Sequence, residues 1–177
     1  MGYVELIEFR PHLLVTNRTS NILIEYLIIR DSPLWTLNLV DVNGLTMRYC
    51  SVLARRTYEH SHGLIDLSAF NTDGIDVSGH NVHVHDCDIW NQDDCIAVKD
   101  TRTDMPSSNM LFERIHASGL GLTIGSIGGT HVQNITFRDS YLYKSYKGIY
   151  MKFRTSSSAG LIEDGKYLEN EKNLICC

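Results

Sequence analysis

Asn134-Ile-Thr-Phe is one copy of a short unit that recurs along this 177-residue chain and decides its fold. In each copy an asparagine is followed by an apolar residue, any residue and a second apolar residue. The other copies are Asn21-Ile-Leu-Ile, Asn81-Val-His-Val and Asn109-Met-Leu-Phe, and Asn43-Gly-Leu-Thr-Met is a looser copy shifted by one position. The last three units begin 28 and 25 residues apart (81 to 109, then 109 to 134). This spacing indicates a structural repeat.

A second β-rich run follows each unit. These runs are Trp35-Thr-Leu-Asn-Leu, Gly74-Ile-Asp-Val, Cys95-Ile-Ala-Val, Leu122-Thr-Ile-Gly and Gly148-Ile-Tyr-Met. A period in the twenties, built of short strands and polar turns, is typical of a solenoid, whose stacked coils bury a shared apolar core with strands about 4.8 Å apart. We therefore predict an all-β parallel β-helix, as a single partial domain over residues 1–177.

The main alternative fold is an antiparallel β-sandwich, in which Asn43-Gly44 and Asp73-Gly74 would be hairpin turns. The repeated asparagines favour coils, because one asparagine per coil can stack into a ladder of side-chain amides. A simple role as turn residues explains the same asparagines equally well.

Both ends of the chain suggest truncation. A solenoid needs capping units, yet the first β-rich unit begins almost at Met1, and Asn173-Leu-Ile-Cys-Cys resembles the opening of another coil. We expect a fragment of a longer β-helix.

Composition excludes several classes of protein. The chain has 43% hydrophobic and 21% charged residues, which is a globular composition. Its net charge of −5 argues against a nucleic-acid partner. It has no run of about 20 apolar residues that would span a membrane, and the stretch MGYVELIEFR does not match the pattern of a signal peptide. The cysteines form no CxxC motif, and we expect Cys50 and Cys87 to be buried free thiols.

Acidic side chains precede two neighbouring strands, in Asn71-Thr-Asp-Gly-Ile-Asp and Asn91-Gln-Asp-Asp-Cys. If the coils stack in register, Asp73, Asp93 and Asp94 gather on one face. We expect a gap of about 6.5–9.5 Å, as inverting glycosidases use to admit a water, and a raised pKa for at least one carboxyl group. A single aspartate in such a place is more often a turn residue, and a calcium site is a further alternative.

Four ordered motifs resemble those of glycoside hydrolase family 28, the polygalacturonases and their relatives. They are Asn71-Thr-Asp-Gly-Ile-Asp, Gln92-Asp-Asp-Cys-Ile-Ala-Val-Lys99, Gly121-Leu-Thr-Ile-Gly-Ser126 and Gly148-Ile-Tyr-Met-Lys152. The resemblance implies a right-handed parallel β-helix that hydrolyses α-linked galacturonan or related chains with inversion. It also implies secretion, a pectin-like acidic polysaccharide as the partner, and no metal or cofactor. We expect a monomer with no membrane partner.

Residue roles follow from the same resemblance. Asp93 would be the general acid, and Asp73 and Asp94 would hold and deprotonate the attacking water. Lys152 would bind a substrate carboxylate, and Asn71 would shape the subsite.

Two positions depart from the family pattern. Leu120 replaces a histidine that supports the acid site, and Tyr150 replaces an arginine. Tyr150, Lys152 and Arg154 alternate along one predicted strand, so Tyr150 could contact a sugar and Arg154 could bind a uronate carboxylate. Loss of the histidine and arginine leaves an alternative function, a carbohydrate-binding β-helix without activity. A polysaccharide lyase fits the paired Asp93-Asp94 less well.

His80, His83 and His85 form the one other cluster of candidate ligands. His83 and His85 would share a strand face, where zinc or copper binding is conceivable. We favour polar surface or packing roles, because spacing alone places no carboxylate or thiolate beside them.

Overall fold

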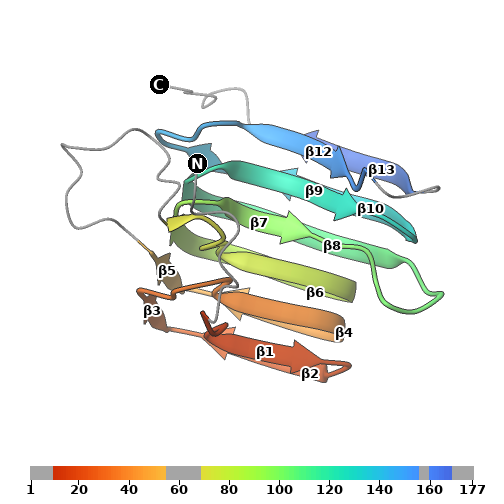
Figure 1. Ribbon diagram of the computed structural model, residues 1–177, viewed down its shortest axis with the longest axis horizontal. Coiled ribbons are helices and arrows are strands. Elements are labelled where there is room, and N and C mark those ends of the chain that lie inside the picture. Colours follow the sequence, from red (N-terminus) through yellow and green to blue (C-terminus); the bar gives the residue numbers. More distant parts are fainter. Residues whose placement is uncertain (1–9, 55–68, 156–159, 169–177) are drawn as a thin grey trace.

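The computed structural model describes residues 10–54, 69–155 and 160–168, which form thirteen strands wound into a parallel solenoid (Figure 1). The strands are β1 (Leu14–Asn17), β2 (Ser20–Glu25), β3 (Ile28–Arg30), β4 (Leu37–Arg48), β5 (Ser51–Leu53), β6 (Ile75–Trp90), β7 (Asp94–Val98), β8 (Ser107–Ser118), β9 (Gly121–Ile127), β10 (His131–Arg138), β11 (Tyr141–Leu142), β12 (Ile149–Phe153) and β13 (Leu161–Leu168). Every strand pairing among these residues is parallel. This confirms the parallel β-helix and excludes the antiparallel sandwich.

The coils stack into three strand columns. One column contains β1, β4, β6, β7, β9 and β12, and a second contains β2, β4, β6, β8, β10 and β13. A shorter third column joins β3, β5 and β11 to the ends of β6 and β8. The long strand β6 passes through all three columns, so it links the corners of one coil.

The repeated asparagines occupy a corner of the coil that requires a left-handed backbone. Asn21, Asn81, Asn109 and Asn134 have φ values of 55°, 60°, 55° and 52°, a region that asparagine and glycine tolerate better than other residues. Gly44, with φ of 83°, takes the equivalent place in its coil. The shifted copy at residue 43 is thereby explained, because glycine fills the left-handed position there.

The two roles proposed for the asparagines both occur. Besides the left-handed backbone, Asn134 Nδ2 donates to Asn109 Oδ1 at 2.8 Å and Asn81 Nδ2 donates to Asn43 Oδ1 at 3.2 Å. Stacked amides thus satisfy each other between coils.

The apolar residues of the repeated units stack into columns inside the solenoid. Leu45, Val82, Met110 and Ile135 occupy matching positions, and all are buried. Phe112 and Phe137 stack with ring centroids 4.8 Å apart. Each coil therefore buries its apolar residues against the coils above and below it.

Three cysteines lie in this interior. Cys50, Cys87 and Cys95 are free and buried, which confirms the prediction for the first two. Within the described residues, no helix is long and apolar enough to cross a membrane. The C-terminal unit at Asn173 lies outside the described residues.

Candidate active site

The first strand column carries the predicted acidic cluster. Asp94 begins β7, and Asp73 lies two residues before β6. The pairing of Ile75 with Ile96 brings Asp73 beside Asp94 on the neighbouring coil, and Gly74 N donates to Asp94 O at 2.9 Å. The glycine is needed for this approach, because a Cβ at position 74 would lie 2.5 Å from the Cys95 carbonyl oxygen.

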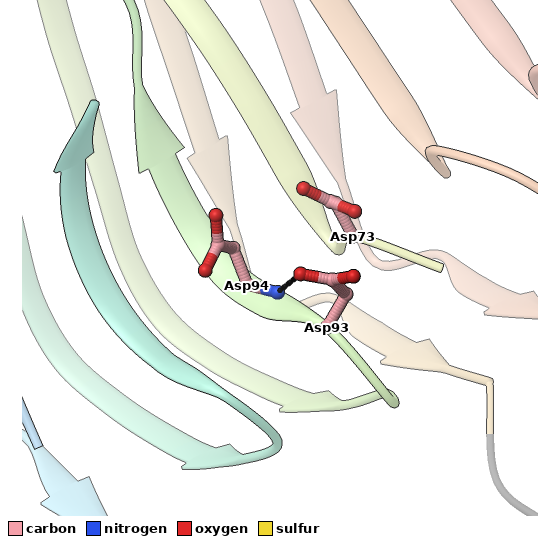
Figure 2. Close-up of side chains that lie close together, drawn as sticks. All are labelled: Asp73, Asp93 and Asp94. Carbon is pink, nitrogen blue, oxygen red and sulfur yellow. Dashed lines mark hydrogen bonds between the residues drawn. The ribbon is translucent and has the colours of Figure 1, made fainter. Parts of the chain in front are cut away.

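Asp73, Asp93 and Asp94 converge on one place (Figure 2). One oxygen of each carboxylate lies within 4.8 Å of an oxygen of both others, and all three residues are buried. These oxygens are closer than the gap of about 6.5–9.5 Å that we expected from inverting glycosidases in general. The reason is geometric: Asp73 is in register with Asp94 on the adjacent coil, at a strand spacing of about 4.8 Å, and Asp93 directly precedes Asp94 in the chain. Carboxylates so arranged can exchange protons with a bound molecule, and they could also hold a hard cation such as calcium.

Backbone donors hold the carboxylate of Asp93. Asn71 N donates to Asp93 Oδ2 at 2.9 Å, and Asp94 N donates to Asp93 Oδ1 at 2.9 Å, the bond drawn in Figure 2. Asn71 adopts a left-handed backbone with φ of 61°. These two bonds, one to each oxygen, fix the orientation of the Asp93 carboxylate.

Burial is the largest influence on the pKa values of Asp73 and Asp94. It raises the pKa of Asp73 well above its usual range, and the charges of Asp76, Asp93 and Asp94 raise it further. Burial also raises the pKa of Asp94, although the hydrogen bond and charge of Lys152 oppose the rise. The pKa of at least one carboxyl group is raised, as expected, but burial rather than the neighbouring negative charges is the main cause, and the rise falls on Asp73 and Asp94.

The raised pKa of Asp73 predicts how the stability of the protein depends on pH. The folded state holds the Asp73 proton more tightly than the unfolded chain, so its stability falls as pH rises from the unfolded pKa, about 4, through the folded value. Asn cannot ionise, and Asp73 Oδ1 is buried without a hydrogen-bond partner. We expect Asp73→Asn to raise the free energy of unfolding by about 1–3 kcal/mol at pH 7, and to change it little below pH 4.

Urea denaturation at pH 3.5 and pH 7 measures this difference. Asp88→Asn is the control, because the Asp88 side chain is 61% exposed and its replacement should leave stability unchanged at both pH values. A loss of stability at pH 7 in Asp73→Asn would contradict the assignment of a burial penalty to this carboxylate.

Lys152 completes the cluster from β12. Lys152 Nζ donates to Asp94 Oδ2 at 2.6 Å. The lysine cation is therefore hydrogen-bonded to one of the two aspartates predicted to act as the base. The neighbouring Tyr150 ring has Lys147 Nζ at 4.4 Å and Lys152 Nζ at 5.5 Å from its centroid. The Tyr150 hydroxyl is buried and has no hydrogen-bond partner among the described residues.

Arg154 lies apart from the three aspartates. It follows the last residue of β12, and its guanidinium donates to Asp100 Oδ1 at 3.1 Å. The structure thus brings Asn71, Tyr150 and Lys152 to the acidic cluster and places Arg154 farther along the same face.

Leu120 is held beside Asp93. Its backbone N–H donates to the Asp93 carbonyl oxygen at 2.8 Å. The preceding Gly119 allows this contact, because a Cβ there would lie 2.2 Å from Asn91 Oδ1. An apolar side chain consequently stands where the family pattern has a histidine.

Two further charged residues lie on this face, and the sequence motifs that contain them assigned them no role. Asp76 and Lys99 form an ion pair at 3.0 Å, and the Asp76 side chain is fully buried. Burial raises the pKa of Asp76 to about 6, and Lys99 opposes the rise. Strand alternation could have found Asp76, because Ile75 and Val77 on either side of it point into the core.

The histidine cluster lies on the second strand column. The rings of His83 and His85 are 4.4 Å apart, as expected for one strand face. His83 Nε2 lies 3.0 Å from Glu113 Oε1, and His85 Nδ1 lies 2.6 Å from Asp86 Oδ2. The described residues contain one group of potential metal ligands close enough to share an ion, and it is the aspartate cluster.

Comparison with known proteins identifies relatives of this chain. The family model for glycosyl hydrolases family 28 matches residues 6–175. A putative rhamnogalacturonase D from Aspergillus niger is 34% identical over 81% of this chain, which spans 30% of that protein. Endopolygalacturonase AN8327 from Emericella nidulans is 29% identical over 91% of the chain, which spans 41% of that protein.

A solved structure shares the fold. Endopolygalacturonase I from Stereum purpureum, complexed with two galacturonates, matches 85% of this chain with a TM-score of 0.69 and 26% sequence identity. The chain covers 43% of that protein. It thus spans less than half the length of each of these relatives.

Proposed function

The chain belongs to glycosyl hydrolase family 28, and from that membership we propose that it hydrolyses α-glycosidic bonds in a uronic-acid-containing, pectin-type polysaccharide by inversion. One observation carries the proposal. Three buried carboxylates from adjacent coils meet with their nearest oxygens within 4.8 Å. Such a group can donate a proton to a glycosidic oxygen and take one from water, so the reaction needs only acid and base catalysis.

Asp93 is the proposed general acid, and Asp73 and Asp94 together hold and deprotonate the attacking water. Backbone donors orient the Asp93 carboxylate, which suits a group that must deliver a proton to one defined atom. Burial raises the pKa of Asp73 and of Asp94. Once ionised, these carboxylates are therefore stronger bases toward water than an exposed aspartate.

The proposed substrate contacts surround these carboxylates. Lys152 attracts a uronate carboxylate, and the Tyr150 ring, whose centroid lies 5.5 Å from Lys152 Nζ, contacts the sugar. Asn71 shapes the edge of the subsite, and Arg154 contacts the polymer farther along the face. We further propose that the protein is secreted and acts as a monomer on this polymer outside the cell.

A reducing-end assay on polygalacturonate and rhamnogalacturonan, run at pH 4–7 with EDTA present, tests this function. We expect new reducing ends that EDTA does not suppress, and nuclear magnetic resonance should show inverted anomeric configuration in the first product. No product from either polymer at any of these pH values would overturn the hydrolase. An unsaturated product that absorbs ultraviolet light would indicate a lyase instead.

A carbohydrate-binding role without catalysis is the second candidate, and Leu120 favours it. Leu120 cannot form the side-chain hydrogen bonds of a histidine beside Asp93. If the hydrolase proposal is right, Leu120→His should raise kcat by about 10-fold, because an imidazole can assist proton transfer at Asp93. Leu120→Met is the control, since it keeps an apolar side chain of similar volume. Tight polysaccharide binding with no turnover in all three proteins would favour the binding role.

A further inference from the structure

Two Asn-X-Thr triplets in the chain match the acceptor pattern for N-linked glycosylation. They are Asn17-Arg18-Thr19 and Asn134-Ile135-Thr136. Neither triplet takes part in the proposed reaction. Because so short a pattern also arises by chance, the surroundings of each asparagine decide whether it can carry a glycan in the folded protein.

The first triplet lies at an open corner of the coil. Asn17 is the last residue of β1, and both Asn17 and Arg18 are exposed. Arg18 turns the chain with a left-handed backbone, at φ of 52°, and Thr19 Oγ1 donates to the Asn17 carbonyl oxygen at 3.4 Å. The Asn17 amide forms no hydrogen bond with any described residue, so its nitrogen is accessible and unused.

The coil that carries Asn17 has one described neighbour. Figure 1 shows β1 and β2 at one end of the described solenoid, and β1 pairs with β4 alone, where Asn17 lies opposite Val40. A sugar on Asn17 can therefore extend away from β4. The same coil exposes the apolar side chains of Leu14, Val15 and Leu23. A bulky polar glycan would shield this strand edge against edge-to-edge association.

The second triplet has coils on both sides. β10, which contains Asn134, pairs with β8 and with β13. Asn134 Nδ2 already donates to Asn109 Oδ1 at 2.8 Å, and Ile135 is buried in the core. A glycan on Asn134 would replace one N–H of this amide and would have to leave between strands only about 4.8 Å away on either side.

We propose that Asn17 is an N-glycosylation site and that Asn134 stays unmodified in the folded protein. The Asn17 amide nitrogen forms a bond to the anomeric carbon of N-acetylglucosamine, supplied by a lipid-pyrophosphate-linked oligosaccharide. The bond from that carbon to the pyrophosphate oxygen breaks, and an amide proton passes to the released pyrophosphate. The assignment rests on the proposed secretion, because this donor is used in the secretory pathway.

The glycan would lie away from the aspartates. β4 and β6 stand between β1 and β7, the strand that begins with Asp94. Three strand spacings of about 4.8 Å each put about 14 Å between β1 and β7 along the solenoid axis. Glycosylation at Asn17 should therefore leave the proposed reaction unchanged.

Secretion from yeast tests the assignment. The full chain is expressed behind a signal peptide, and protein from both the medium and the cells is treated with PNGase F in heavy-oxygen water. Mass spectrometry then identifies each asparagine that carried a glycan, because it becomes a labelled aspartate. We expect a glycan at Asn17 on the larger part of the molecules, and a lower occupancy at Asn134. Asn17→Gln and Thr19→Ala should each abolish the glycan at Asn17.

Thr19→Ser is the matched control, because serine keeps the hydroxyl that the acceptor pattern requires. It should retain the glycan at Asn17. Thr136→Ala removes the second triplet and should leave the occupancy of Asn17 unchanged. Folding is not at risk in the Thr19 variants, because the hydroxyl forms a single exposed hydrogen bond.

The results separate this site from the proposed reaction. The added signal peptide makes the result independent of whether the native protein is secreted, and a reducing-end assay on the same samples reports hydrolysis. A glycan at Asn17 supports the site even if the protein hydrolyses no polymer. Hydrolysis by protein without a glycan at Asn17 overturns the site and leaves the hydrolase. Occupancy of Asn134 equal to or above that of Asn17, or no glycan at all, also overturns it.

Discussion

Asp93→Asn is expected to lower kcat on polygalacturonate by about 10²–10⁴-fold, the contribution usual for a positioned general acid. Asparagine has no proton to give to the glycosidic oxygen. Its amide oxygen can accept one of the two backbone bonds that now hold the carboxylate. Oligosaccharide affinity should therefore stay within about 3-fold of the parent value, which is a small fraction of the free energy of binding.

Asp88→Asn provides the comparison, because Asp88 is an exposed aspartate paired with His116 at 3.3 Å on the third strand column. That variant should retain full turnover. Full activity in Asp93→Asn would show that another group donates the proton. Equal thermal stability of the variants would establish that a lost rate reflects chemistry rather than unfolding.

Lys152→Met is expected to lower kcat/KM by about 10²-fold, within the range for removing one partner of a buried charge pair. Lys152 is the cation bonded to the buried Asp94. Without it, the pKa of Asp94 rises further, since burial is the largest influence and the lysine opposes it. Ionised Asp94 is the proposed base, so activity should fail at a higher pH as the solution is acidified.

The pH dependence of kcat/KM for Lys152→Met and Lys147→Met measures this effect. Lys147 is a suitable control because its Nζ also lies close to the Tyr150 ring, 4.4 Å from the centroid, and it forms no ion pair with a described aspartate or glutamate. We expect Lys147→Met to keep the parent profile. An unshifted acidic limb in Lys152→Met would mean that Asp94 is not the group whose ionisation limits the rate.

Local sequence patterns were enough to predict the coiled architecture. The asparagine units predict parallel coils because side-chain alternation and the left-handed corner repeat once in every coil. The shifted copy at Asn43 looked imperfect until the structure placed Gly44 at the corner. The order of acidic motifs also predicted the meeting of Asp73 with Asp93 and Asp94, since strands that follow similar turns stack in register.

Local patterns did not predict the distance between the carboxylate oxygens or the partners of the cations. Lys152 and Asp94 are 58 residues apart in the sequence, and Arg154 and Asp100 are 54 residues apart. Strand alternation placed Arg154 on the same face as Lys152, whereas the structure pairs Arg154 with Asp100. Strand alternation places Asp76 on this face, but its pairing with Lys99 of the neighbouring coil depends on how the coils stack.

The chain alone therefore determines its coils, its core and the strand column that carries the acids, because these depend on periodicity within each turn. Side-chain partners, burial of charge and the raised pKa of Asp73 and Asp94 depend on the stacking of distant turns. Those properties arise only once the coils are packed, because each one reflects the removal of water and the approach of groups from other turns.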